Sequence, residues 1–142
     1  MKGSKDLLSS VLKTTQMGQI GIRSVLKNPV NASLRKALNS QLQEYDSIEQ
    51  EAHAIASSRG WTLEELDPSI RLMTNMMTRA CLKFGDTDSK AASMMMRGNM
   101  RGVIKGYRNL HQFNHSDERV SVLMQKLIDC EESNIHQMQG YL

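Results

Sequence analysis

The stretch ASMMMRGNMRGVIKGYRNLHQF, residues 92–113, decides the fold. Its apolar and small residues recur in alternating steps of four and three, the spacing of the stripe that a helix buries in a bundle. The stripe consists of Ala92, Met96, Asn99, Val103, Gly106, Leu110 and Phe113. Asn99 interrupts it, and a buried amide costs roughly 1–3 kcal/mol unless it finds partners. The stretch therefore predicts a helix whose buried side meets a polar cluster or a ligand.

Four other segments repeat this spacing. We expect helices over about residues 5–27, 32–58 and 117–140, and a shorter helix that begins after Asp67-Pro68. In the short helix the apolar positions predicted to face inward are Ile70, Met73, Met77, Ala80 and Phe84. Polar residues interrupt the long stripes here too, at Gln41 in the second helix and at Glu131 and Asn134 in the last. Thr15 and Gly18 form a small notch in the first.

Composition supports one helical domain over residues 1–142. Aromatic residues make up 4% and methionines number 11, so the core must be aliphatic and rich in methionine, which favours helices over sheet. No apolar run approaches the roughly 18 residues that span a bilayer, and the first ten residues do not resemble a signal peptide. We expect a soluble, intracellular protein without a membrane partner. Cys81 and Cys130 lack any CxxC spacing and are predicted to be reduced, largely buried thiols.

The spacing of the segments also resembles a known layout. Two long hairpins, roughly 5–58 and 88–140, are joined by a connection of about 30 residues that is long enough to cross a bundle. The hairpins carry similar tripeptides before their turns, Gly21-Ile22-Arg23 and Gly106-Tyr107-Arg108. On these features the chain resembles the ferritin-like superfamily, and within it a group of small bacterial helical-bundle proteins without a settled function.

A looser similarity points to the spore coat protein F-like family. It is carried by Asn28-Pro29, Leu34-Arg35 and Arg59-Gly60-Trp61. Together the resemblances imply an all-α, ferritin-like four-helix bundle of two helical hairpins, with a short extra helix in the crossover connection. They also imply a cytoplasmic protein, or one associated with the spore.

Active ferritin-like proteins take one glutamate from each of two helices and a Glu-x-x-His from each of the others. This chain departs from that pattern on every helix. The first helix offers Gln16 and Gln19, the second Glu44 with Ser47 three residues on, the fourth Asn99, and the fifth Glu131 with Asn134. The remaining set of Glu44, Glu131, Asn99 and Asn134 could hold a single weakly bound metal ion. We expect no cofactor.

These departures predict a non-catalytic bundle with a degenerate metal site, which acts as a binding, scaffold or coat-type component. The alternative is a metal-binding or residual ferroxidase-like protein that uses the same mid-bundle carboxylates. No phosphate loop and no set of nucleophile and base can be assembled from the sequence, so the balance lies against an enzyme.

Charge is distributed in stripes along the chain. Residues 1–43 hold seven basic and one acidic residue (+6), 44–70 one and seven (−6), 71–114 eight and two (+6), and 115–142 two and five (−3). Arg97, Arg101, Lys105 and Arg108 fall within roughly 80° of arc on one helix face, which we call the basic ridge. The ridge predicts a solvated outer face, or a sequence-nonspecific, salt-sensitive site for nucleic acid or another polyanion. It could also meet an acidic helix of a second subunit.

The methionines leave three interpretations open. They could fill core gaps, form an adaptable interface for a second subunit or another protein, or supply a soft thioether site for Cu(I). From the charge stripes and the possible methionine-rich interface we expect a homo-oligomer, a dimer or larger.

Overall fold

The computed structural model describes residues 3–112 and 117–142. These residues form five α-helices and no strand, as the sequence predicts for the fold class. The helices are α1 (Ser4–Leu26), α2 (Ala32–Arg59), α3 (Ser69–Leu82), α4 (Thr87–Gln112) and α5 (Glu118–Gln139). None of them, over the described residues, is long and apolar enough to cross a bilayer.

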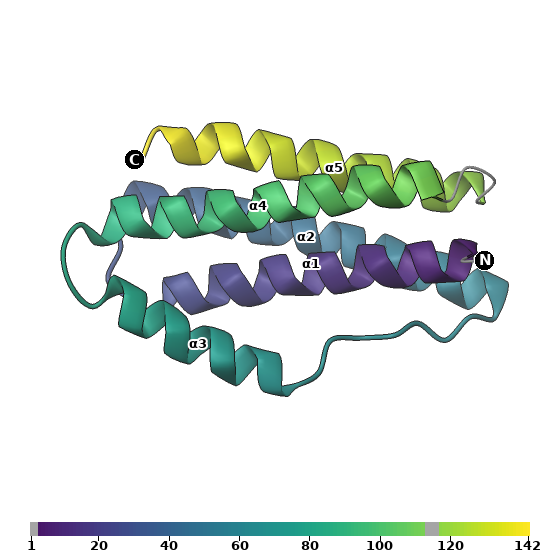
Figure 1. Cartoon of the computed structure of the whole chain (residues 1–142), viewed down its shortest axis with the longest axis horizontal. Coiled ribbons are helices and arrows are strands. Elements are labelled where there is room, and N and C mark those ends of the chain that lie inside the picture. Colours follow the sequence, from purple (N-terminus) through teal and green to yellow (C-terminus); the bar gives the residue numbers. More distant parts are fainter. Residues whose placement is uncertain (1–2, 113–116) are drawn as a thin grey trace.

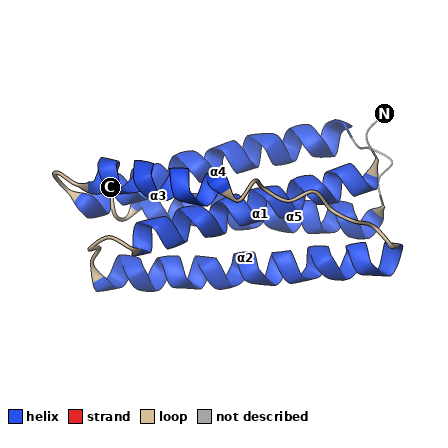
Figure 2. Cartoon of the chain, turned by 90° about the horizontal axis from the view of Figure 1, so that it is seen from below, coloured by secondary structure: helices blue, strands red, loops and turns tan. Residues whose placement is uncertain are grey.

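The four long helices lie side by side along the long axis of the molecule (Figure 1). The helices α1 and α2 form one antiparallel pair and α4 and α5 form a second, and the pairs meet where α1 lies against α4 and α2 against α5. The helix α3 lies below this group in Figure 1, and in the view from below it lies in front of the long helices (Figure 2). Each long helix therefore turns one stripe toward a shared interior.

The connection between α2 and α4 runs back along the molecule. It begins with an extended segment, residues 61–68, and continues as α3, which packs against α1 (Figure 1). Gln16 of α1 accepts a hydrogen bond from the Leu66 backbone N–H at 3.2 Å, and the Ser24 hydroxyl donates to Asn75 of α3 at 2.6 Å. The crossover is thus tied to α1 by polar contacts.

Local signals set the helix ends. The Asn31 side chain caps α2 by accepting from the Leu34 N–H at 2.7 Å, and Gly60 ends that helix in the left-handed region at φ 68°. Asp117 caps α5 in the same way as Asn31, with the Arg119 N–H as its donor at 2.9 Å. The predicted helix boundaries agree with these ends to within a few residues.

The stripes that the sequence predicts for α1 and α2 are confirmed, since their residues are buried apart from the half-buried Gly18. The spacing assigns to them Leu8, Val11, Thr15, Gly18, Ile22 and Val25 in α1, and Leu34, Leu38, Gln41, Tyr45, Ile48, Ala52 and Ile55 in α2. In α4 the stripe is displaced by one residue near its start: Met95 is buried and Met96 is half-buried. Gly102 is also buried, beside Val103. Phe113, the last residue of the predicted stripe, lies outside the described residues.

The short helix lies where it is predicted, but the prediction of which of its residues face inward is wrong. Met73, Met77 and Phe84 are 59%, 68% and 73% exposed, whereas Thr78 and Leu82 are buried. The reason is that α3 turns its hydroxyl and amide side chains to α1 and leaves its apolar side outside. Cys81 is likewise exposed rather than buried, and Cys130 is half-buried.

Candidate binding site

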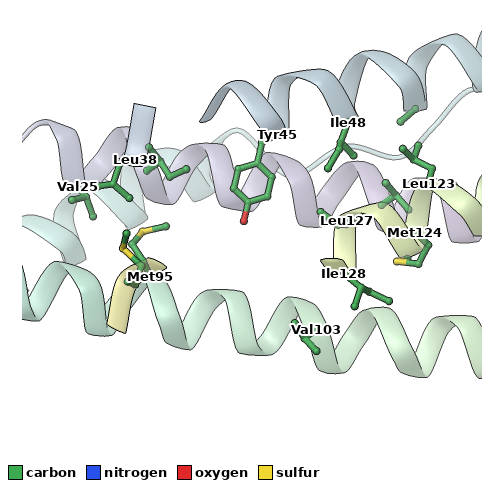
Figure 3. Close-up of a cluster of buried hydrophobic side chains, with 14 of the residues drawn as sticks. Val25, Leu38, Tyr45, Ile48, Met95, Val103, Leu123, Met124, Leu127 and Ile128 are labelled. Atoms are coloured by element: carbon green, nitrogen blue, oxygen red, sulfur yellow. The ribbon is translucent and has the colours of Figure 1, made fainter. Parts of the chain in front are cut away.

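A polar group lies at the middle of the molecule, where the core would otherwise be aliphatic. Tyr45 of α2 is fully buried, and its hydroxyl donates a hydrogen bond to Oδ1 of Asn99 on α4 at 3.2 Å. Figure 3 shows the ring pointing from α2 toward α4, with Leu38 and Met95 to one side and Leu127 and Ile128 to the other. We call Tyr45, Asn99 and Glu131 the polar centre.

Two atoms of the polar centre have no hydrogen-bond partner among the residues that the structure describes. They are Nδ2 of Asn99 and Oε2 of Glu131, and both side chains are 2% exposed. An unpaired buried polar atom costs about 1–3 kcal/mol, and native structures contain few of them. The polar interruption of the α4 stripe at Asn99 thus marks a buried site with unsatisfied hydrogen-bonding atoms.

Burial controls the protonation of this group. Loss of solvation raises the pKa of Glu131 to about 8, although its interaction with Tyr45 opposes the shift. The pKa of Tyr45 is also raised, first by burial and then by the Glu131 charge. At neutral pH Glu131 is therefore mostly protonated, and it can donate as well as accept a hydrogen bond.

Glycines make room for the polar centre. A Cβ atom at position 18 would lie 2.5 Å from Cζ of Tyr45, and one at position 102 would lie 3.0 Å from the carboxyl carbon of Glu131. Neither position can carry a side chain without displacing these groups. The sequence predicts the small notch at Gly18. It does not predict that Gly102 leaves space for Glu131, because the predicted stripe of residues 92–113 passes through the neighbouring Val103 and not through Gly102.

A cavity of about 470 Å³ opens onto the polar centre between α1, α3 and α4. Tyr45, Asn99 and Glu131 all line it. Its apolar lining comes mainly from methionines, and its glycines come from both long helices: Met17, Gly18, Gly21, Val25, Leu66, Met77, Met94, Met95, Gly98 and Gly102. The volume falls in the range of small-molecule sites.

Basic side chains lie around the same cavity. Arg97, Arg101 and Lys105 of the basic ridge line it together with Lys13 of α1. Lys13 forms an ion pair with Glu64 at 2.8 Å. Arg108, the remaining member of the ridge, is exposed and does not line the cavity. The ridge and the interrupted stripe, predicted separately, therefore meet at one site.

The predicted metal-binding set is only partly brought together. Asn99 and Glu131 belong to the polar centre, and Asn134 lies next to Tyr45. Glu44 is exposed and does not line the cavity, and its Oε2 accepts a hydrogen bond from the Cys130 thiol at 3.0 Å. Among the described residues, no three histidine, cysteine or acidic side chains form a cluster that could hold a metal ion.

The contact with Glu44 changes the pKa of the Cys130 thiol and does not complete the predicted metal site. Burial, followed by the hydrogen bond with Glu44, raises the pKa of Cys130 well above its usual range. Asn134 donates to the same sulfur at 3.7 Å. Gln41, the other predicted interruption, lies apart from this group, with its Nε2 donating to Gln137 at 2.7 Å.

Sequence reasoning missed the part played by Tyr45. It was placed correctly on the buried stripe of α2, but a tyrosine among aliphatic residues is typical of plain packing. The available signal was that a buried tyrosine hydroxyl needs a partner, and Asn99 was the unexplained polar residue on another stripe.

Comparison with known proteins bears on the fold. No protein-family model and no curated protein matches the chain. The crystal structure of a DUF305 fragment from Deinococcus radiodurans is similar over 99% of this chain and 95% of that chain, with a TM-score of 0.76 and 13% sequence identity. At this identity the likeness shows a shared all-helical fold. The ferritin-like and spore coat resemblances stay predictions.

Proposed function

We propose that this protein is a non-catalytic binding component, with a ferritin-like arrangement in which the place of a metal centre has become the floor of a ligand cavity. One observation carries the proposal. The unpartnered Nδ2 of Asn99 and Oε2 of Glu131 both belong to side chains that line the cavity of about 470 Å³. A ligand that reached them would satisfy hydrogen bonds that the folded chain leaves unmade.

The chemistry of the polar centre favours binding over catalysis. Glu131 is mostly protonated at neutral pH, and its neighbours Tyr45 and Asn99 already share one hydrogen bond. A redox pair of hard cations would need about four carboxylates, whereas this centre has one. Scaffold or coat-type roles belong to the same proposal, since each needs a stable bundle that holds a partner.

The test uses a neutral probe, 1,10-decanediol, titrated into the ¹⁵N-labelled protein. We expect saturable shifts of amide signals that gather on Gly18, Gly98 and Gly102. A Cβ at Gly98 meets no atom within 4 Å, so Gly98→Leu can fill the cavity without a clash at its first carbon. That variant should bind at least about tenfold more weakly, in keeping with loss of the cavity volume. Gly98→Ala is the matched control and should bind within about twofold of the parent.

The metal-binding alternative makes a different prediction. Elemental analysis of the purified protein would find one or more equivalents of iron or manganese, and Glu131→Ala would remove them. Such a result would overturn the non-catalytic proposal. The exposed position of Glu44, outside the lining of the cavity, does not favour this alternative.

We also propose a homo-oligomer, a dimer or larger, in a cytoplasmic or spore-associated setting. The apolar outer side of α3 supports self-association, because Leu72, Met73, Met76 and Met77 are 59–68% exposed there. Charge supports it as well, since the basic ridge of one subunit can face the exposed Asp129 and the half-buried Glu132 of another. Nucleic acid is a less favoured partner, because three of the four ridge residues line the cavity.

A further inference from the structure

The entrance of the cavity carries two guanidinium groups that no carboxylate neutralises. Arg97 and Arg101 stand one turn apart on the same face of α4, and both line the cavity. Neither forms an ion pair or a side-chain hydrogen bond with another described residue, and the nearby Glu64 is engaged by Lys13. An anion is the group that this pair would attract.

The walls between entrance and floor are apolar and adaptable. Met17, Met77, Met94 and Met95 surround the space with Val25 and Leu66. Unbranched thioether side chains can adjust to ligands of different shape, and they offer no hydrogen bond to a polar body. The middle of the ligand should therefore be a hydrocarbon chain.

The polar centre, which forms the floor of the cavity, favours a ligand whose inner end is polar. Nδ2 of Asn99 is a donor without an acceptor, while Oδ1 of the same amide is occupied by Tyr45. The protonated Glu131 beside it adds a second donor. A hydroxyl or carbonyl oxygen would accept from these groups, and a hydroxyl could also donate to Oε2 of Glu131.

We propose that the ligand is an anionic amphiphile, a straight-chain carboxylate whose head lies between Arg97 and Arg101 and whose inner end carries a hydroxyl or carbonyl oxygen that reaches Asn99. This inference rests on the proposed function, because it names the class of ligand for the same cavity. It assigns Arg97 and Arg101 of the basic ridge to the head group of a small molecule rather than to a polymer.

Four ten-carbon probes test the charge and the inner oxygen separately. They are 10-hydroxydecanoate, decanoate, 1,10-decanediol and 10-amino-1-decanol, each titrated calorimetrically at pH 6.5 below the concentration at which it forms micelles. We expect 10-hydroxydecanoate to bind roughly three- to tenfold more tightly than the diol, the range for two charge pairs near a surface. Its affinity should exceed that of decanoate by a similar factor, because one net hydrogen bond contributes a free energy of that size. The amino alcohol should bind most weakly.

Matched variants locate each contribution. Arg97→Gln with Arg101→Gln should remove the advantage of 10-hydroxydecanoate over the diol, whereas Arg108→Gln, on the same ridge but outside the cavity, should preserve it. Asn99→Leu should remove the advantage over decanoate. If that variant does not fold, the parent protein keeps the anion part of the test, because added salt should weaken binding of 10-hydroxydecanoate and leave binding of the diol unchanged.

The outcomes separate the two proposals. If none of the four probes binds, the cavity does not serve as a binding site and the proposed function fails. If the diol or the amino alcohol binds as tightly as 10-hydroxydecanoate, the anion inference is overturned while the binding function stands. Equal losses in the Arg108→Gln variant and the double variant would also overturn it, since the effect would then be one of net charge.

Discussion

Glu131 brings a carboxyl group into a buried space beside Tyr45, Gly102 and Asn99, where its charge is poorly solvated because the side chain is 2% exposed. Folding therefore favours the protonated form, and the pKa rises to about 8. In the unfolded chain the same group ionises near its ordinary value of about 4.3. Between these two values the folded protein holds a proton that the unfolded chain has lost, so rising pH shifts the balance toward unfolding.

We predict that Glu131→Gln flattens the dependence of stability on pH. Below about pH 4 this group should contribute no pH dependence in the parent protein, because it is protonated in both states. Between pH 4.5 and 8 the parent should lose stability as pH rises, by up to about 1.4 kcal/mol per unit from this group. The variant should lose less and be the more stable protein at pH 8.

Urea denaturation at several pH values measures the effect. Glu132→Gln, a change at the neighbouring half-buried residue outside the polar centre, provides the control and should leave the slope of the parent unchanged. A slope that is the same in the parent and in Glu131→Gln would contradict the assigned protonation of the polar centre.

At the scale of helices, α4 depends on its glycines for contact with α5. A Cβ at Gly106 would lie 2.6 Å from Cγ1 and 2.9 Å from Cδ1 of Ile128, so the helix axes approach more closely than an alanine would permit. Sequence spacing placed Gly106 on the buried stripe but gave no reason for a residue with poor helix propensity there. The reason is the close approach of α5.

We predict that Gly106→Ala destabilises the protein by about 1–3 kcal/mol, the usual cost of overpacking a core. Gly98→Ala is the matched change on the same helix. With no atom within 4 Å of its Cβ, it should be neutral or stabilising by up to about 1 kcal/mol, because alanine is the better helix former. Thermal unfolding of both variants measures the difference, and equal stabilities would show that α4 and α5 can move apart freely.

The sequence predicted the helices well because their stripes recur over many turns and their ends carry strong signals, such as Asn31 and Gly60. It failed for α3, where an apolar stripe of normal helical spacing lies on the outer side. Periodicity identifies the apolar side of a helix but not whether that side meets the core of the same chain.

The site was predictable in part for a similar reason. Asn99, Glu131 and the basic ridge were each visible as departures from a pattern on one helix. Their meeting at one cavity depends on the rotation of α4 relative to α1 and α2, which no single stripe encodes. The separation of Glu44 from Glu131 has the same origin, since adjacent residues of α2, Glu44 and Tyr45, point in different directions.

At the scale of the whole molecule, the exposed apolar side of α3 predicts self-association. We expect Leu72→Gln with Met76→Gln to lower the molecular mass in solution to that of one chain, because each residue is 65% exposed and neither lines the cavity. Stability of the single chain should change little, since exposed substitutions away from special features usually have effects within about 0.5 kcal/mol.

Light scattering coupled to size exclusion measures this mass. Val122→Gln is the control, because Val122 is 63% exposed on α5, away from α3. A parent protein that is already monomeric at micromolar concentration would contradict the prediction, as would a double variant whose mass equals that of the parent.

The crossover has a further consequence for how the molecule opens. In α3 the buried residues are Thr78 and Leu82, whereas each long helix buries at least seven. Regions with few buried contacts detach at a lower free-energy cost than the global unfolding of a protein. Because Thr74, Met77 and Thr78 of α3 line the cavity, we predict that detachment of this single helix speeds the release of a bound ligand. The rate of exchange can thus evolve through α3 while the four long helices keep their packing.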